Sequence, residues 1–293
     1  ALKGYYAQRG IELDGDEIFV SDGAKSDVGN ILNLFSQDNT VLVPDPVYPV
    51  YVDTNIMDGR KILYMNANAD NGFLPLPDPA VKADIIYLCS PNNPTGNGLT
   101  PKELDELLAE VPSQTVVLID EAYASFVSTD TSYIKKLVNK YPNLIISRTL
   151  SKFYGLPGLR MGFGFMSKEL EKFSRYSNKY LGYNRISEDI AIAALKSDAH
   201  YRNIAKLMNE DRERYEKEIG VLPGFKVYES VANFILIKYP IELKEALQKA
   251  FAKQSYKVKF MNEPDINTHL RITLGRPEQN RIVIDTIKKI ASK

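Results

Sequence analysis

Short runs of apolar, β-branched residues recur over the first 166 positions of the chain and alternate with amphipathic segments. Each run is nearly continuous in Val, Ile and Leu, which is typical of strands buried on both faces of a mainly parallel sheet. The predicted strands are Glu17–Ser21, Val41–Val43, Lys61–Tyr64, Ala83–Cys89, Val116–Ile119, Leu144–Ser147 and Gly162–Met166, with helices at Asp27–Phe35, Lys102–Glu110 and Asp130–Asn139. The pattern indicates a large α/β domain over residues 1–166, with ligands expected at the carboxyl ends of the strands.

The pattern changes after Phe165, where long helical stretches replace the alternation. Helices are predicted over Lys168–Tyr180 and Glu188–Glu218, and the second is unusually long. Apolar β-rich runs and helices then follow: strands at Phe225–Tyr228, Asn233–Lys238, Tyr256–Phe260 and Leu270–Leu274, and helices at Glu242–Lys253 and Pro277–Ser292. We therefore expect a second, smaller α+β domain over residues 167–293.

Composition narrows the class of protein. The 293 residues carry 37 basic and 37 acidic side chains, and this zero net charge argues against binding nucleic acid or a membrane surface through bulk electrostatics. A small-molecule ligand is the better expectation. The chain has a single cysteine, Cys89, so it cannot form an intramolecular disulfide, which fits a reducing compartment such as the cytosol. One cysteine and two histidines also make a structural zinc site an unfavoured expectation. The sequence shows no signal peptide and no apolar run of roughly 20 residues.

One segment combines a lysine, hydroxyl groups and an arginine. Lys152 stands beside Thr149 and Ser151, and Arg160 follows eight residues later. A lysine that forms a Schiff base needs a fixed carbonyl partner, and pyridoxal phosphate supplies both a carbonyl and an anion that hydroxyls and an arginine can bind. The alternative is a charged surface loop.

Two polar positions end neighbouring predicted strands. Asn93 follows the strand Ala83–Cys89, and Asp120 ends the next strand, so both side chains are expected at the same edge. A carboxylate there is an N-cap, a metal ligand, or the partner that keeps a pyridinium nitrogen protonated. Tyr123 can donate its hydroxyl to a ring oxygen. Asn-Pro and Thr-Gly are also ordinary turn formers, and no cluster of metal-ligating residues lies nearby.

The segment Ser21–Ser26, around Gly23, lies between a predicted strand and a predicted helix. Small residues at a helix N-terminus leave backbone N–H groups accessible, and the helix dipole favours an anion such as phosphate. The alternative is an ordinary N-cap formed by Ser26 or Asp27. The segment is not a P-loop, because the Walker spacing is absent.

Further residues have both a ligand role and a structural alternative. Tyr48 or Tyr51 stacks on a planar ring, or both belong to the core. Arg271 interrupts an apolar strand and therefore binds either an internal carboxylate or the carboxylate of a substrate. Tyr183 and Asn184 line a substrate cleft or form a turn between helices.

Taken in order, these features resemble the fold-type-I, class I/II pyridoxal-phosphate aminotransferases over essentially the whole chain. Three motifs carry the resemblance: Asn93-Pro-Thr-Gly96, Asp120-Glu-Ala-Tyr123 and Ser151-Lys152 followed by Arg160. The resemblance implies that Lys152 forms the Schiff base and moves the proton, that Asp120 binds the ring nitrogen, and that Arg271 binds the substrate α-carboxylate. It also implies the other cofactor contacts: Asn93 and Tyr123 on the ring hydroxyl, Tyr48 stacked on the ring, and the amides of Ala24 and Lys25 with Thr149 or Ser151 and Arg160 on the phosphate.

The resemblance divides over the substrate. The first hundred residues, with Ser21-Asp-Gly-Ala-Lys-Ser-Asp27, resemble LL-diaminopimelate aminotransferases, whereas Arg148-Thr-Leu-Ser-Lys152 and Leu270-Arg-Ile-Thr-Leu-Gly275 resemble histidinol-phosphate aminotransferases. A phosphate ester needs further cations, for which Arg185 and Arg276 are candidates. We expect transamination between an amino acid or similar amine and a 2-oxo acid such as 2-oxoglutarate. The alternatives are an enzyme like threonine-phosphate decarboxylase, which the lysine segment also resembles, and a non-catalytic regulatory domain that binds the cofactor.

The resemblance also implies a homodimer that serves amino-acid biosynthesis, and the cysteine usage fits a cytoplasmic location. In this family an N-terminal segment commonly helps to cover the substrate. The chain opens on Ala1 rather than methionine, and Leu2–Arg9 has the pattern of the end of a helix. We therefore expect that an N-terminal segment is missing.

Overall fold

The computed structural model describes residues 1–74, 78, 81–128, 130–170 and 182–292. The chain divides into two compact units, one formed by residues 1–93 and 98–198 and the other by residues 94–97 and 199–293. The domain boundary predicted from the sequence, after residue 166, stays a prediction. Among the described residues, no helix is both long and apolar enough to cross a membrane.

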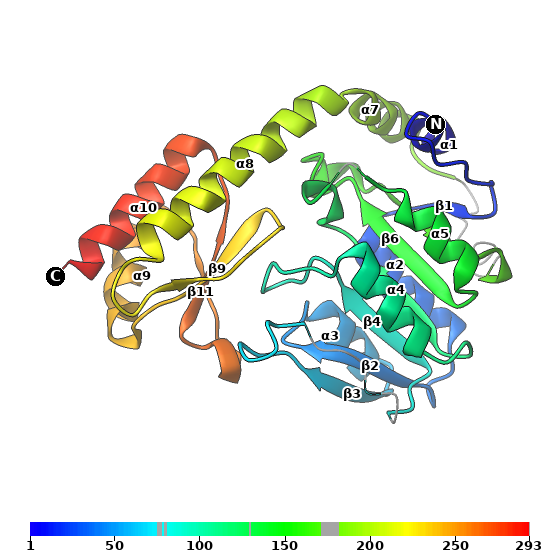
Figure 1. Cartoon of the computed structure of the whole chain (residues 1–293), viewed down its shortest axis with the longest axis horizontal. Helices are drawn as coiled ribbons and strands as arrows, with labels where there is room; N and C mark the ends of the chain where they lie inside the picture. The colour runs from blue at the N-terminus through cyan, green and yellow to red at the C-terminus, as the bar shows by residue number, and fades with distance from the viewer. Residues whose placement is uncertain (75–77, 79–80, 129, 171–181, 293) are drawn as a thin grey trace. The chain divides into compact units, whose positions relative to one another are not determined.

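The first unit is built on a seven-stranded sheet that is mainly parallel (Figure 1). The strand order is β1-β7-β6-β5-β4-β2-β3, and among the described strands of this sheet β7 is the one that runs antiparallel to the others. The strands are β1 (Ile18–Ser21), β2 (Thr40–Asp45), β3 (Lys61–Asn66), β4 (Ile85–Cys89), β5 (Val116–Asp120), β6 (Leu144–Thr149) and β7 (Gly162–Met166). Every strand predicted for this part of the chain is confirmed. Both β4 and β7 are buried along their whole length, as a sheet covered on two faces requires.

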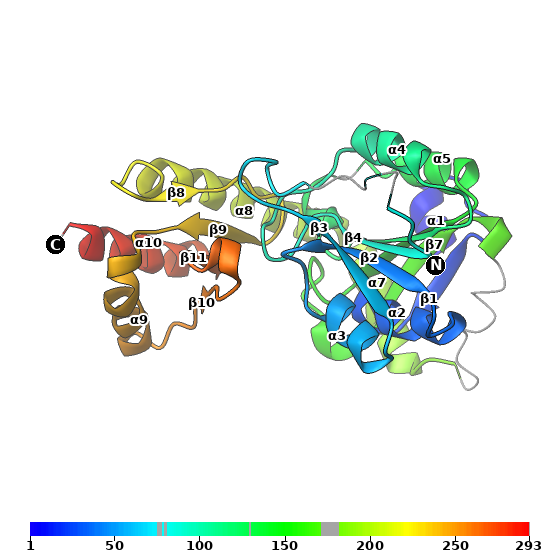
Figure 2. The same cartoon turned by 90° about the horizontal axis from the view of Figure 1, so that it is seen from below.

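Helices cover both faces of this sheet (Figure 2). The helices α2 (Ala24–Asn30) and α3 (Val50–Met57) lie on one face, and α4 (Pro101–Glu110) and α5 (Tyr133–Lys140) lie on the other. A short helix, α1 (Leu2–Ala7), begins the chain. The sequence pattern does not predict α3, because its β-branched residues have low helix propensity. Burial of Tyr51, which stacks on Tyr87, overrides that propensity.

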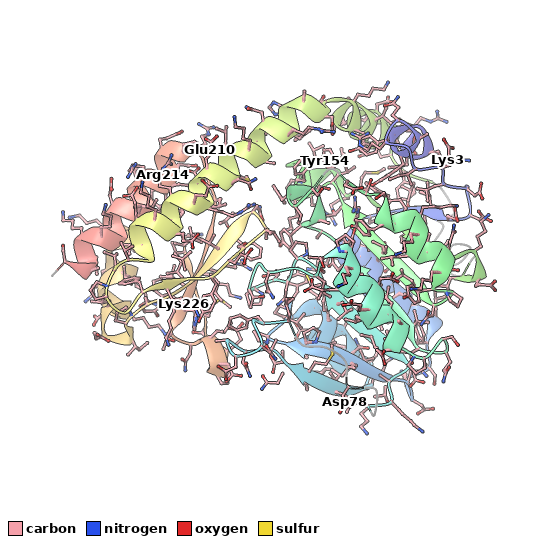
Figure 3. The ribbon with its side chains drawn as sticks, in the orientation of Figure 1. Lys3, Asp78, Tyr154, Glu210, Arg214 and Lys226 are labelled. Atoms are coloured by element: carbon pink, nitrogen blue, oxygen red, sulfur yellow. The ribbon has the colours of Figure 1, made fainter. Side chains whose placement is uncertain are left out.

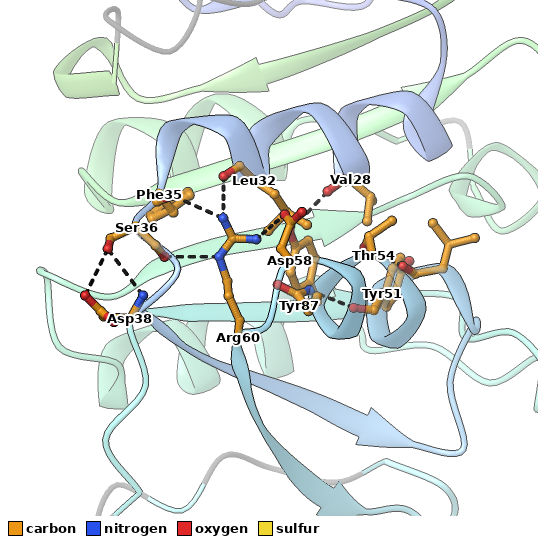
Figure 4. A network of polar contacts seen from close by, with 12 residues as sticks. Val28, Leu32, Phe35, Ser36, Asp38, Tyr51, Thr54, Asp58, Arg60 and Tyr87 are labelled. Atoms are coloured by element: carbon orange, nitrogen blue, oxygen red, sulfur yellow. Dashed lines mark hydrogen bonds and ion pairs between the residues drawn. The ribbon is translucent and has the colours of Figure 1, made fainter.

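The buried Arg60 binds the carboxyl-terminal end of the helical segment 24–34, which begins with α2. This segment continues as a 3₁₀ turn, and Arg60 donates to the carbonyl oxygens of Leu32 (2.7 Å), Phe35 (3.0 Å) and Ser36 (3.1 Å) at its end (Figure 4). It also donates to the carboxylate of Asp58 at 2.6 Å. The last carbonyls of a helix have no partner within the helix, and the five donors of a guanidinium can satisfy several of them.

The second unit is a four-stranded antiparallel sheet packed on helices, so the predicted α+β character is confirmed. The strand order is β10-β11-β9-β8. The elements are β8 (Lys226–Val227), β9 (Phe234–Lys238), β10 (Lys259–Phe260), β11 (His269–Thr273), α9 (Lys244–Lys253) and α10 (Pro277–Ala291). The core joins one face of the sheet to these helices and to Tyr215 of the preceding helix.

The prediction of one long helix over Glu188–Glu218 is wrong. The structure has two helices there, α7 (Arg185–Lys196) and α8 (Asp198–Ile219), which are separated at Ser197. The Ser197 hydroxyl donates to a carbonyl oxygen of α7 at 2.9 Å, and its backbone leaves the helical conformation. Serine and aspartate side chains compete with the backbone for such bonds, which favours a break. Most of the predicted helix Lys168–Tyr180 lies outside the described residues.

Candidate active site

Gly23 lies in the turn between β1 and α2, next to Thr149 and Arg160, and Ser151 binds Thr149. We name these four residues, all predicted from the sequence, the Gly23 cradle. A Cβ atom on Gly23 would lie 3.0 Å from Thr149 Oγ1 and 3.8 Å from Arg160 Nη2. Gly23 has a φ of 110°, which side chains disfavour. Thr149 Oγ1 accepts from the Ser151 N–H at 3.1 Å, and Arg160 donates to the Asp22 carbonyl at 3.0 Å. Hydroxyls, a guanidinium and main-chain groups thus meet where a side chain at Gly23 would fill the space.

Gly162 of β7 packs against this turn and was not among the residues predicted for the site. A Cβ atom on Gly162 would lie 2.4 Å from Gly23 Cα and 2.6 Å from the Arg148 carbonyl oxygen, so no side chain fits. The signal was the pair Gly162 and Gly164 inside a predicted strand, because glycine within a strand marks a close backbone approach.

Ala24 and Lys25 form the first turn of α2, where backbone N–H groups have no acceptor within the helix. Ala24 is buried and Lys25 is exposed. Their role as donors to a phosphate stays a prediction.

Asp120 ends β5 as a buried carboxylate with 4% of its surface exposed. Its Oδ2 accepts from the Tyr51 hydroxyl at 2.7 Å, and its Oδ1 accepts from the Ala122 N–H at 2.9 Å. Burial raises the pKa of Asp120, while these two hydrogen bonds and the charge of Lys152 oppose that rise. A cation placed against Asp120 would offset the cost of burying the carboxylate.

Tyr51 belongs to the core, which settles the alternatives that the sequence left open for it. The side chain is fully buried on α3 and stacks on Tyr87 with ring centres 5.3 Å apart. Its hydroxyl is aimed at Asp120, and this contact was missed from the sequence. Tyr48 is only partly buried and meets the Tyr51 ring edge to face at 6.0 Å. Stacking of Tyr48 on a ligand stays a prediction.

Lys152 lies on the loop after β6 and is exposed. Its Nζ is 5.6 Å from the centre of the Tyr123 ring, and its charge lowers the pKa of Asp120 against the effect of burial. Asn93 is buried in the loop after β4. Because β4, β5 and β6 are parallel neighbours, their carboxyl ends lie at the same edge of the sheet, which we call the carboxyl edge. Asn93, Asp120 and Lys152 lie at or just after these strand ends.

The two predicted substrate residues, Asn184 and Arg271, do not belong to the loops that follow β4, β5 and β6. The side-chain oxygen of Asn184 accepts two backbone N–H groups of α7, so helix capping accounts for this oxygen. Arg271 lies on β11 of the second unit, with its guanidinium carbon 5.0 Å from the centre of the Phe234 ring. Contact of Asn184 or Arg271 with a substrate stays a prediction.

Asp27 adds a carboxyl group near the Gly23 cradle. Its Oδ2 accepts from the hydroxyls of Ser21 at 2.9 Å and Ser147 at 2.5 Å, and both serines are buried. Burial raises the pKa of Asp27 to about 7, the two hydrogen bonds oppose the rise, and the charge of Asp120 adds to it.

We expect Asp27→Asn to make the stability of the protein less dependent on pH. Since the pKa is about 7 when folded and about 3.9 when unfolded, the folded state binds a proton that the unfolded state has released. This contribution to stability is complete below about pH 4 and is lost as the pH rises through about 7. Between about pH 5 and about pH 8, the wild-type protein should lose roughly 1–3 kcal/mol of unfolding free energy that the variant keeps. Urea denaturation at both pH values measures this, and equal losses in the two proteins would contradict it.

The known proteins that this chain resembles in sequence and in fold include several aminotransferases. The sequence profile of the family described as aminotransferase class I and II matches residues 1–287. The chain is 32% identical over 285 residues to a histidinol-phosphate aminotransferase of Ruminiclostridium cellulolyticum, covering 95% of this chain and 78% of that protein. It is also 32% identical over 305 residues to an LL-diaminopimelate aminotransferase of Bacteroides thetaiotaomicron, covering 90% of this chain and 72% of that protein. The crystal structure of histidinol-phosphate aminotransferase from Sinorhizobium meliloti in complex with pyridoxal-5'-phosphate has the same fold, with a TM-score of 0.85 and 20% identity over 99% of this chain and 81% of that one.

Proposed function

Because this chain belongs to the class I and II aminotransferases and is a pyridoxal-phosphate-dependent enzyme, we propose that it transfers an amino group by means of the residues at the carboxyl edge. The observation that carries this proposal is the placement of one lysine, Lys152, over the Tyr123 ring and within electrostatic reach of the buried Asp120. Lysine, phenol and buried carboxylate are the three groups that the chemistry needs.

The Gly23 cradle fits a phosphate group. Its hydroxyls and the Arg160 guanidinium are donors to anionic oxygens, and the absence of a side chain at Gly23 lets the backbone lie close to Thr149 and Arg160. The Ala24 and Lys25 amides would add two donors. In this proposal Asn93 and Tyr123 bind the ring hydroxyl, Tyr48 covers the ring, and Asp120 keeps the ring nitrogen protonated.

When bound, the cofactor supplies an electron sink for the negative charge that forms as the substrate loses its Cα proton. Lys152 would hold the cofactor, and its free Nζ would take up the Cα proton of the substrate and return it. Asp120 acts throughout as a fixed anion, which Tyr51 and the Ala122 N–H hold in one orientation. Arg271 is proposed to bind the α-carboxylate through its paired N–H groups.

We propose that the amino donor is histidinol phosphate or LL-diaminopimelate, the compounds for which the two relatives are named. Glutamate formation from 2-oxoglutarate should be measured with each donor. We expect one of them to give a kcat/KM about tenfold or more above the other. If neither yields glutamate while threonine phosphate releases carbon dioxide, the decarboxylase alternative replaces this proposal.

We further propose that the protein works as a homodimer in the cytoplasm. Resemblance to the family supports the dimer, and the free, buried Cys89 is consistent with a reducing compartment. Sedimentation of the purified protein tests the oligomeric state.

A further inference from the structure

Glu121 and Arg148 stand directly beside the proposed cofactor residues but on the other face of the sheet. Glu121 follows Asp120, and Arg148 precedes Thr149. Successive side chains of a strand point to opposite faces. Asp120 accordingly contacts Tyr51 of α3, whereas Glu121 and Arg148 contact α5 on the opposite side (Figure 2). The two charges therefore lie at the carboxyl edge but on the face of the sheet opposite to Asp120.

The pair is buried and closely hydrogen-bonded. The exposed fractions of the Arg148 and Glu121 side chains are 6% and 2%. Arg148 donates to Glu121 Oε2 from Nε at 2.9 Å and from Nη2 at 2.7 Å. The Tyr133 hydroxyl accepts from Arg148 Nη2 at 2.9 Å and donates to Glu121 Oε1 at 2.7 Å. The Tyr6 hydroxyl accepts from Arg148 Nη1 at 3.2 Å.

The location of the pair is the point where β5 and β6 stop pairing. The Glu121 N–H donates to the Ser147 carbonyl at 2.8 Å, one residue beyond the end of β5. Past this point, the segment that follows β5 leads to Tyr123 and the segment that follows β6 leads to Lys152. A link between Glu121 and Arg148 therefore sets the starting positions of both loops.

The same cluster reaches the lysine loop through α1. Tyr6 of α1 binds Arg148, and its neighbour Tyr5 has its hydroxyl 3.2 Å from that of Tyr154. Tyr154, labelled in Figure 3, follows Lys152 by two residues. The Lys152 loop is thus joined to the pair by the chain and by α1.

Stability alone does not account for two charges at this position. Removing an ion pair from water is costly, and well-packed apolar residues in its place are often as stable or more stable. Apolar contacts do not fix angles, whereas two donors on one carboxylate oxygen and a bridging phenol do. A buried pair of this kind is suited to holding an orientation.

We propose that Glu121 and Arg148 form a positioning pair that sets the orientation of Asp120 and Lys152 for proton transfer. The proposal rests on the function proposed above for those two residues. Because both side chains lie on the face opposite to Asp120, neither member of the pair is placed to touch the substrate or the cofactor. Loss of the pair should therefore slow the chemical step and change the protonation behaviour of the site, while substrate binding changes little.

The test compares the holoenzyme with the double variant Glu121→Met/Arg148→Met, which keeps the bulk and removes both charges. We expect a melting temperature close to that of the wild type, a kcat lower by about tenfold or more, and a KM changed by less than about threefold. The midpoint of the pH titration of the cofactor absorbance should move by about half a unit or more. A folded double variant with wild-type kcat and an unmoved titration would overturn the proposal.

Single substitutions cover the case in which the double variant does not fold. Tyr133→Phe removes the hydroxyl that bridges the pair, and we expect the same changes in smaller size. Tyr141→Phe is the matched control, because its hydroxyl lies at the end of α5 and binds Asp105 instead. If Tyr133→Phe behaves as Tyr141→Phe does in both kcat and titration, the pair has no positioning role. Failure of the proposed function would show separately, as a wild-type enzyme without reducible cofactor on Lys152.

Discussion

Lys152→Ala should abolish covalent attachment of the cofactor and lower kcat by about 10⁴-fold or more, because one side chain both holds the cofactor and moves the proton. Alanine cannot form the Schiff base and offers no base near the position that Lys152 Nζ occupies beside the Tyr123 ring. Borohydride reduction followed by peptide mass spectrometry measures attachment, and the kinetics of glutamate formation measure kcat.

A matched control for this experiment is Lys168→Ala, which removes an exposed lysine paired with Asp14. We expect its attachment and turnover to equal those of the wild type, since surface ion pairs contribute little. If the Lys152→Ala protein yields the same borohydride-trapped adduct as the wild type, another lysine holds the cofactor and the proposed site is wrong.

Asp120→Asn should lower kcat by about 10²- to 10³-fold with a smaller effect on KM, because a neutral amide cannot hold a ring nitrogen in its protonated form. Asparagine has nearly the size of aspartate, so the packing against Tyr51 is retained. Steady-state kinetics with the better amino donor measure the change.

Tyr51→Phe separates the charge of Asp120 from its orientation. The variant removes the 2.7 Å hydrogen bond but leaves the carboxylate and the Ala122 N–H in place. We expect a loss in kcat of about tenfold, smaller than that of Asp120→Asn. An Asp120→Asn enzyme that is as active as Tyr51→Phe would show that the negative charge has no part in the reaction.

Most strands of both units were predictable, because they lie in short apolar runs bounded by turn residues. Their parallel arrangement then explains why Asn93 and Asp120, far apart in sequence, follow neighbouring strands at one edge. The motif around Lys152 was equally clear. Local sequence carries this information because strand patterning and turn residues act over a few positions.

Contacts between distant side chains were not predictable in the same way. Tyr51 meets Asp120 across 69 positions, and nothing in either segment indicates which buried hydroxyl lies beside which carboxylate. The helix α3 was missed because its local propensity opposes its structure, and the break at Ser197 was missed because neither glycine nor proline marks it in the sequence. In each case packing or a side-chain hydrogen bond outweighs the local pattern.

The partners of Arg60 determine how one layer of the first unit should respond to ionic strength. Three of its four bonds go to uncharged carbonyl oxygens, and the fourth goes to Asp58. On the opposite face, α4 and α5 are joined by Asp105 with Lys136 and Lys140, whose side chains are largely exposed. Salt screens exposed ion pairs but hardly affects bonds to buried carbonyl groups. Added salt should therefore loosen the junction of α4 and α5 while the attachment of the α2 segment to the start of β3 stays intact.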